Sequence, residues 1–523
     1  MFFGDLKQIF HISYKYIFIY RKLKYYLRSS LQLYLMSEEI ASYLGPKGYT
    51  IKKEYIEIDE LNLLKKELTV SAYVPKSSIA KPIPFPIYRE TKNKIYIPKF
   101  YGLENYGEPD AVITPEGINI DVDFKGSLRD YQKPVVEKWL KAAKKKGCGL
   151  IEADCGAGKT CMAIWLISQL KKKTLIIVHK EFLLNQWKER LEQFMPDAKI
   201  GRIQGPIIDI EGKDVVIGML QSLSMKDYEQ TMFLDFGFTI IDETHHVSAE
   251  VFSRVLFKAV TKYMLGLSAT MDRADGLTKV FKMFLGNVEA KWKREAQENV
   301  VVKAIEYNND DPEFGMELTN YRGQTDFVKM ITKICDYSFR TEFILKVAEE
   351  TWKKNKIQIM IIGHRKKQLV YIHDAIKHRG FATVGYYIGG MKEKDLKITE
   401  SKDIVIATYT MAEEALDIKS LGTIIMATPK KDVRQAVGRI MRSGGNKLVI
   451  DIVDQHEIFK RQWAKRRAWY NKQSYKILYT TNEGYNMDEW DDISKGKKRK
   501  KSCKSTKTYK FVNTQPFGKS QIE

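Results

Sequence analysis

The stretch that decides the fold of this chain is Ala153-Asp154-Cys155-Gly156-Ala157-Gly158-Lys159-Thr160. It follows the short apolar run 149–151 and opens a segment in which apolar residues recur at helical spacing. Small residues let successive backbone N–H groups converge on phosphate oxygens, while the lysine reaches the outer phosphates and the threonine hydroxyl can bind magnesium. Ala153 stands where the strict phosphate-loop pattern has a glycine. We therefore predict that residues 153–160 bind the phosphates of a nucleoside triphosphate.

A pair of carboxylates, Asp242-Glu243, follows the apolar run 238–241 and lies 82 residues after Thr160. The pattern predicts that Asp242 and Thr160 hold Mg²⁺, and that Glu243 orients and deprotonates the attacking water. Phosphoryl transfer depends on in-line positioning and charge neutralisation more than on covalent chemistry. The two motifs therefore predict an enzyme that hydrolyses ATP with the help of Mg²⁺.

Short apolar runs alternate with helical stretches along most of the chain. One set lies at 149–151, 175–178, 215–217, 238–241 and 264–267, and a second at 357–362, 382–387, 404–407, 423–427 and 448–453. Strands that alternate with helices are typical of parallel, doubly wound sheets. We therefore predict an α/β fold with two tandem doubly wound parallel-sheet domains, a small α+β N-terminal domain and a basic C-terminal tail.

These patterns also predict where the domains begin and end. We expect an N-terminal extension (1–35), since Met36 offers a second start, an N-terminal accessory domain (36–123), an ATP-binding domain (124–300), a second α/β domain (301–459) and a basic C-terminal segment (460–523). Past about residue 480 the chain becomes low in complexity, for which we expect poor order.

The formal net charge of +22 is concentrated at the two ends of the chain, and residues 460–523 carry half of it. Positive charge concentrated in this way favours binding of a polyanionic partner, so we expect a nucleic acid. Five cysteines without a C-x-x-C pair favour a reducing compartment over disulfides or structural zinc. The apolar N-terminus is interrupted by lysine and arginine and lacks a cleavage site, so we expect no membrane span, no secretory signal and an intracellular protein.

Further motifs make residues 128–442 resemble the superfamily-2 helicases. Besides the two motifs above, they are Leu128–Gln132, Val178–Lys180, Leu184–Trp187, Gly218–Leu223, Ser268–Thr270, Met411–Ile418 and Gln435–Arg442. The resemblance implies two RecA-like domains with Mg²⁺-ATP between them. It also implies that the segments 178–187 and 218–223 contact a nucleic-acid strand, and that the 268–270 loop couples hydrolysis to domain movement.

The resemblance implies roles for individual residues as well. Gln132 would read the adenine edge, and Asp417 would contact the nucleotide. Gln435, Arg439 and Arg442 would be catalytic, since two arginines three residues apart share a helical face and can reach the γ-phosphate as arginine fingers.

Two short stretches, Asp275–Phe281 and Lys460–Tyr470, resemble the helicases of large cytoplasmic DNA viruses, whose poxvirus member acts in transcript release. This resemblance implies movement on, or unwinding of, single-stranded or duplex DNA during viral transcription, replication or repair, with that machinery as a partner. It implies a cytoplasmic location in a viral factory or virion, although Lys497–Lys501 also matches a nuclear-import pattern.

Several alternatives stay open on the sequence alone. The motor could act on RNA, or serve as the motor subunit of a restriction- or nuclease-type complex, for which no carboxylate cluster is found outside the motor. The basic, aromatic segment 460–476 fits equally well a nucleic-acid clamp and a packed C-terminal helix of the second domain.

Overall fold

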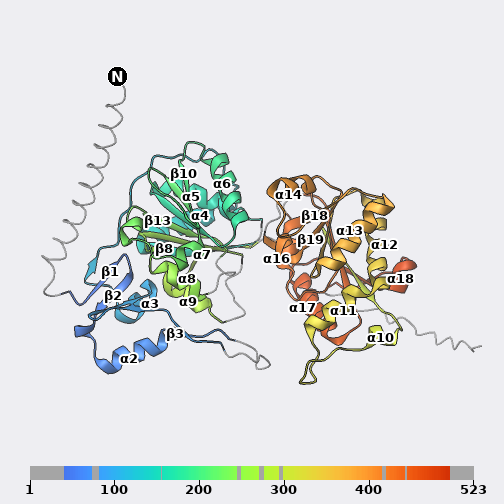
Figure 1. Cartoon of the computed structure of the whole chain (residues 1–523). Coiled ribbons are helices and arrows are strands. Elements are labelled where there is room, and N and C mark those ends of the chain that lie inside the picture. Colours follow the sequence, from blue (N-terminus) through green and yellow to red (C-terminus); the bar gives the residue numbers. More distant parts are fainter. Residues whose placement is uncertain are drawn as a thin grey trace, which may run out of the picture. The chain divides into compact units, whose positions relative to one another are not determined.

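In the computed structural model the chain divides into two compact units, Met1–Arg294 and Glu295–Glu523. The structure describes residues 40–73, 82–154, 156–243, 249–269, 276–293, 299–414, 418, 420–441 and 444–494. Figure 1 shows an α/β arrangement in each unit, with helices packed around a central sheet. Among the described residues, no helix combines the length and apolar character needed to cross a membrane.

The first unit is built on an eight-stranded sheet whose strand order is β11-β10-β12-β9-β13-β14-β8-β15. Every neighbouring pair is parallel except β10 and β11. The strands are β8 (Cys148–Ala153), β9 (Thr174–Val178), β10 (Ile200–Gln204), β11 (Ile207–Asp209), β12 (Val215–Met219), β13 (Phe238–Ile241), β14 (Tyr263–Ser268) and β15 (Val288–Trp292). The helices are α4 (Gln132–Lys146), α5 (Lys159–Leu170), α6 (Glu181–Phe194), α7 (Leu220–Met225), α8 (Ala249–Leu256) and α9 (Thr278–Leu285).

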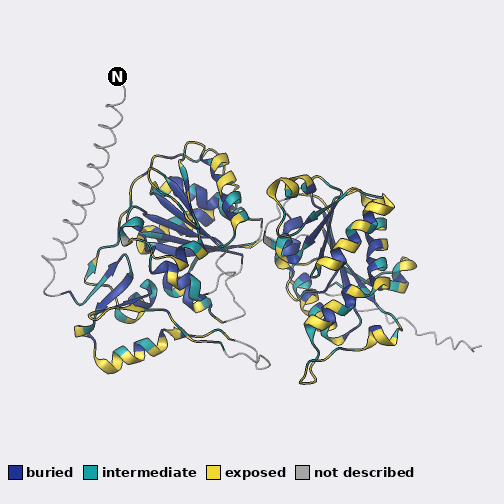
Figure 2. Cartoon of the chain, viewed as in Figure 1, coloured by how far each residue is buried: buried dark blue, intermediate teal, exposed yellow. Residues whose placement is uncertain are grey.

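Both faces of this sheet are covered, which explains why its central strands are apolar throughout. Successive side chains of a strand point to opposite faces. Accordingly, Ile176 and Val178 pack in the core that includes α4, α5 and α6, while Leu175 and Ile177 pack in the core that includes α7, α8 and α9. Strands β9 and β13 at the centre of the sheet are therefore buried from end to end, and the sheet is largely dark blue in Figure 2.

The N-terminal part of the first unit has a sheet of its own, in the order β5-β6-β2-β1-β7. Its strands are β1 (Ser42–Gly45), β2 (Gly48–Lys52), β5 (Arg89–Glu90), β6 (Lys94–Ile97) and β7 (Ala111–Val112). Helices α2 (Ile58–Glu67) and α3 (Lys99–Tyr106) and the pair β3 (Thr69–Val70) and β4 (Phe85–Pro86) complete it. This part shares one hydrophobic core with α8 and α9. It is therefore packed against the α8 and α9 side of the eight-stranded sheet.

The second unit contains another eight-stranded sheet, in the order β18-β19-β17-β20-β21-β16-β22-β23, and only β23 runs antiparallel. The strands are β16 (Val300–Tyr307), β17 (Ile359–Gly363), β18 (Val384–Tyr387), β19 (Ile404–Thr408), β20 (Thr423–Met426), β21 (Lys447–Asp454), β22 (Lys476–Thr481) and β23 (Asp491–Asp492). The helices are α10 (Pro312–Gly315), α11 (Phe327–Asp336), α12 (Ser338–Asn355), α13 (Lys366–Arg379), α14 (Glu393–Glu400), α15 (Tyr409–Glu414), α16 (Arg434–Ile440), α17 (Glu457–Lys472) and α18 (Asn482–Asn486).

All ten predicted apolar runs are strands, and the predicted α/β fold with two tandem RecA-like parallel sheets is confirmed. In the two large sheets, strands β10, β11, β15, β16, β22 and β23 were not predicted. Strands β11, β15 and β23 lie at sheet edges, β10 and β16 contain charged residues, and β22 lies in the part of the chain that the sequence assigns to a basic segment.

The C-terminal region differs most from the prediction. The sequence predicts a separate basic segment beyond residue 459. Instead, α17 continues to Lys472 and packs in the second unit, as the packed-helix alternative for 460–476 expects, and β22 pairs with β16 inside the second sheet. Residues 481–494, for which the sequence predicts poor order, include α18 and β23. The basic residues dominate the composition of this region, while the apolar side chains between them are the ones that pack into the core.

Candidate active site

The phosphate loop lies between β8, which ends at Ala153, and α5, which begins at Lys159. Gly156 and Gly158 have φ values of 79° and 78°, in the left-handed region that favours glycine. A Cβ atom on Gly158 would also lie 2.4 Å from the side-chain nitrogen of Gln132. The backbone conformation therefore favours glycine at 158, and a larger residue there would also displace the Gln132 side chain. Thr160 lies in the first turn of α5, and Cys155 lies outside the described residues.

Gln132 supports this loop from α4. Its Nε2 donates to the Ala157 carbonyl oxygen at 2.7 Å, and its Oε1 accepts from the Arg129 N–H at 2.9 Å. The neighbouring Tyr131 stacks on Trp292 with ring centroids 4.4 Å apart. Gln132 is therefore placed against the phosphate loop, and reading of an adenine edge by this residue stays a prediction.

The carboxylate pair follows β13. The Asp242 carboxylate accepts from the Glu243 N–H at Oδ1 (2.9 Å) and from the Trp187 indole N–H at Oδ2 (2.8 Å). Burial, together with repulsion from Glu243, raises the pKa of Asp242 to about 6. Glu243 adopts a φ of 48°, an uncommon backbone conformation for a residue with a side chain. A bound cation would offset the cost of keeping the buried Asp242 ionised, so this carboxylate fits a metal ligand.

Lys159 brings the two motifs together. Its Nζ lies 3.2 Å from the Ala153 carbonyl oxygen and 3.6 Å from Glu243 Oε1, and the side chain is only 9% exposed. The sheet explains this proximity, because β14 alone separates β8 from β13, and all three parallel strands end at the same edge. A lysine, a loop of backbone N–H groups and two carboxylates therefore converge at one edge of the first sheet. This set can bind a polyphosphate, hold a divalent cation and accept a proton from water.

Trp187 belongs to this site, although the sequence places it in a segment expected to contact a nucleic-acid strand. The side chain is 1% exposed and packs in the core of the first unit, so that expectation is wrong for Trp187. Leu183, Leu184, Trp187 and Leu191 form the buried stripe of α6. That helical spacing was the available signal that Trp187 faces inward.

The remaining predicted residues are divided between the two units. Gln435 and Arg439 lie four residues apart on α16, and the Arg439 Nη2 donates to the backbone carbonyl oxygen of Glu413. Ser268 and Ala269 are buried at the end of β14 in the first unit. Thr270, Asp417 and Arg442 lie outside the described residues, and so does Asp275, the first residue of the stretch 275–281.

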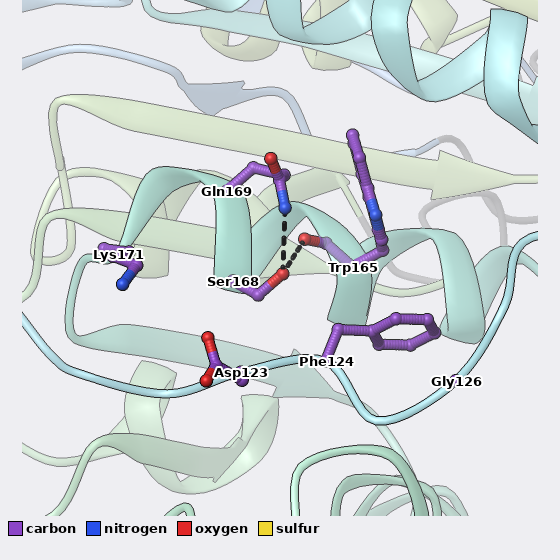
Figure 3. Close-up of a pocket in the computed structure, with 7 residues that line it drawn as sticks. All are labelled: Asp123, Phe124, Gly126, Trp165, Ser168, Gln169 and Lys171. Atoms are coloured by element: carbon purple, nitrogen blue, oxygen red, sulfur yellow. Dashed lines mark hydrogen bonds between the residues drawn. The ribbon is translucent and has the colours of Figure 1, made fainter.

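A hollow of about 450 Å³ lies elsewhere on the first unit (Figure 3). It is lined by Asp123, Phe124, Gly126, Trp165, Ser168, Gln169 and Lys171. Gln169 follows Lys159 by ten residues of α5, which corresponds to about 15 Å along a helix. The hollow is therefore separate from the phosphate loop.

Comparison with known proteins adds the following similarities. Residues 125–273 match the family model described as "Type III restriction enzyme, res subunit". A protein of Acanthamoeba polyphaga mimivirus, named as an ATP-dependent RNA helicase (L396), is 36% identical over 458 residues, which cover 84% of this chain and 87% of that protein. A protein of Invertebrate iridescent virus 6, named as a helicase (161L), is 25% identical and covers 71% of this chain and 92% of its own length. A protein of African swine fever virus, named as an ATP-dependent RNA helicase (QP509L), is 26% identical and covers 71% of this chain and 80% of its own length.

Proposed function

Because this chain belongs to the superfamily-2 helicases, among those of large DNA viruses, we propose that it couples ATP hydrolysis to movement along DNA or to its unwinding. The chain is an ATP-hydrolysing enzyme of the helicase class. The observation that carries the proposal is the position of Lys159, between the phosphate loop and the carboxylate pair.

Within the first unit, each side chain has a distinct proposed task. Lys159 and the N–H groups of residues 153–160 hold the phosphates, and Asp242 with Thr160 holds Mg²⁺. When bound, the metal ion would neutralise negative charge on the phosphate oxygens. Glu243 accepts a proton from the attacking water, since it lies beside Lys159 and next to Asp242 in the chain.

The second unit supplies the other proposed contacts. Arg439 and Arg442 stabilise the negative charge that develops on the γ-phosphate, and Gln435 and Asp417 assist at the nucleotide. Gln132 would recognise adenine. When the γ-phosphate leaves, the contact that these arginines make is lost, and the two units shift along the bound strand.

We propose DNA as the nucleic acid along which the enzyme moves, because the viral relatives belong to DNA viruses and the chain is strongly basic. RNA is the second candidate, since two of these relatives are named as RNA helicases. We place the activity in viral transcription, including transcript release, or in replication or repair, with that machinery as the partner. The proposed location is the cytoplasm of the infected cell or the virion.

The test is the ATPase rate measured in parallel with single-stranded DNA, duplex DNA and RNA. We expect DNA to stimulate turnover more than RNA does, and Lys159→Ala to abolish turnover in a folded protein. Stimulation by RNA alone would establish the second candidate instead. No stimulation by any nucleic acid would refute the motor, and a Lys159→Ala protein that hydrolyses ATP at a comparable rate would refute the site.

A further inference from the structure

The loop between β20 and α16 is held by buried side chains at three of its carbonyl oxygens. Arg340 Nη1 donates to the Ala427 oxygen at 2.8 Å, and the Tyr409 hydroxyl donates to the Thr428 oxygen at 2.5 Å. Arg466 Nη1 donates to the Lys430 oxygen at 2.7 Å. The three donors are at most 4% exposed. The loop that leads into the arginine-bearing helix α16 is therefore fixed from inside the second unit.

Two of these donors are anchored by neighbouring carboxylates of β21. Arg466, on α17, pairs with both oxygens of Asp451 at 2.7 and 2.8 Å, and Arg340, on α12, pairs with both oxygens of Asp454 at 2.5 and 2.9 Å. All four groups are buried. A buried ion pair is weak evidence for stability, because desolvation offsets its attraction and apolar residues can replace it. The directional bonds to the loop point instead to a role in positioning.

Lys430 continues the connection through its side chain. Its Nζ lies 2.5 Å from each carboxylate oxygen of Glu413 and 4.8 Å from the centre of the Tyr409 ring. Glu413 lies on α15, and its backbone carbonyl oxygen accepts from Arg439 Nη2. A continuous set of contacts therefore runs from Arg466 through Lys430 and Glu413 to Arg439.

We propose that Arg466 and Lys430 are positioning residues for ATP hydrolysis. Arg466 fixes the backbone of Lys430, Lys430 fixes Glu413, and the Glu413 carbonyl oxygen orients the Arg439 guanidinium. The inference rests on the proposed function, in which Arg439 acts on the γ-phosphate. It also assigns α17 to the ATPase machinery, because Trp463, Arg466 and Tyr470 are buried in the second unit and are not free to clamp a nucleic acid.

The first test compares Lys430→Met with Lys431→Met in the full chain. Lys431 is the exposed neighbour, so both variants lose one positive charge from the same loop. A misplacement of about 1 Å can cost about 10²-fold in rate, so we expect kcat of Lys430→Met to fall by about 10- to 100-fold. The KM for ATP should match that of Lys431→Met, because Lys430 is not among the groups proposed to hold ATP, while the thermal midpoint should fall, because Lys430→Met removes the ion pair with Glu413. Lys430→Arg should restore most of the rate.

The second test is Arg466→Lys. A lysine keeps the positive charge beside Asp451 but cannot pair with that carboxylate and also donate to the Lys430 carbonyl oxygen through a planar fork. We expect a lower kcat with an unchanged KM for ATP. The inference is overturned if Lys430→Met turns over as fast as Lys431→Met, or if its KM rises in proportion to the loss of kcat.

Failure of this inference is distinguishable from failure of the proposed function. An inactive Lys159→Ala protein beside a fully active Lys430→Met protein would overturn the positioning role alone. A Lys159→Ala protein with full activity would overturn the nucleotide site itself, whatever the Lys430 variants do.

Discussion

Replacing Trp187 with phenylalanine isolates one hydrogen bond in the proposed active site. The Trp187 indole donates to Asp242 Oδ2 at 2.8 Å, and phenylalanine keeps an aromatic ring at this buried position while removing the donor. Asp242 then keeps only one of its two hydrogen bonds, the one from the Glu243 N–H. Burial raises the pKa of Asp242, so the ionised form of this carboxylate depends on the donors that remain.

Trp139→Phe is the matched control. Trp139 is also buried in the first unit, and its indole donates to an uncharged acceptor, the Gly149 carbonyl oxygen, at 2.9 Å. A hydrogen bond to a charged group contributes about 1.5–3 kcal/mol and a neutral one about 0.5–1.5 kcal/mol. The packing lost on changing tryptophan to phenylalanine is similar in the two variants. Trp187→Phe should therefore lower the free energy of unfolding by about 1 kcal/mol more than Trp139→Phe does.

The two variants should differ more in activity than in stability. Urea unfolding at pH 7.5 measures stability, and the ATPase rate over a series of Mg²⁺ concentrations measures the site. We expect Trp187→Phe to need more Mg²⁺ and to turn over about tenfold more slowly, since about 1.4 kcal/mol corresponds to a factor of ten. Trp139→Phe should retain the wild-type Mg²⁺ dependence. Equal ATPase losses in both variants, or wild-type activity in Trp187→Phe, would show that Trp187 contributes packing alone.

Three further predictions follow from other parts of the chain. Glu243→Gln should bind ATP while turnover falls by at least about 10²-fold, because the proton acceptor is lost and the phosphate-binding groups remain; ATP binding and hydrolysis are measured separately. Deleting 495–523, which lies outside the described residues, should leave basal ATPase unchanged and flatten the salt dependence of binding to a single-stranded oligonucleotide, since each phosphate contact contributes about 0.7–0.9 to the log–log slope. Burial, together with Lys430 and Arg365, lowers the pKa of His364 to about 4. Because this folded-state pKa lies below the unfolded value, His364 contributes to the free energy of unfolding above about pH 6.5. That contribution, at most about 3 kcal/mol, is lost as the pH falls towards 4. Thermal midpoints across this range should fall less steeply in His364→Asn than in the wild type.

Each of these predictions has a result that contradicts it. Weak ATP binding by a folded Glu243→Gln protein would argue against its role as the base. An unchanged salt slope after deletion of 495–523 would mean that its basic residues do not contact phosphate, and nuclear import would then explain the lysine run better. Parallel pH profiles for His364→Asn and the wild type would show that His364 is not the group that titrates.

The strands and the nucleotide-binding motifs could be predicted from the sequence because their signals are local. A parallel strand covered on both faces needs a short apolar run, and a phosphate loop needs small residues followed by lysine and threonine. These requirements act within about ten residues of chain. The sequence alone therefore predicts the α/β alternation, the phosphate loop at residues 153–160 and the carboxylate pair Asp242-Glu243.

The tertiary structure decided which side chains meet. Trp187 and Asp242 are 55 residues apart, Arg466 and Lys430 are 36 apart, and Arg340 and Asp454 are 114 apart. No local pattern specifies such pairs, because each depends on the strand order and on which face of the sheet a helix covers. Composition was misleading for α17, because its charged residues outnumber the buried apolar side chains that attach it to the second unit. One of its charged residues, Arg466, is itself buried in that unit. Local periodicity thus determined the elements and the loop chemistry of this protein, whereas long-range packing determined the groups that hold Asp242 and Arg439 in place.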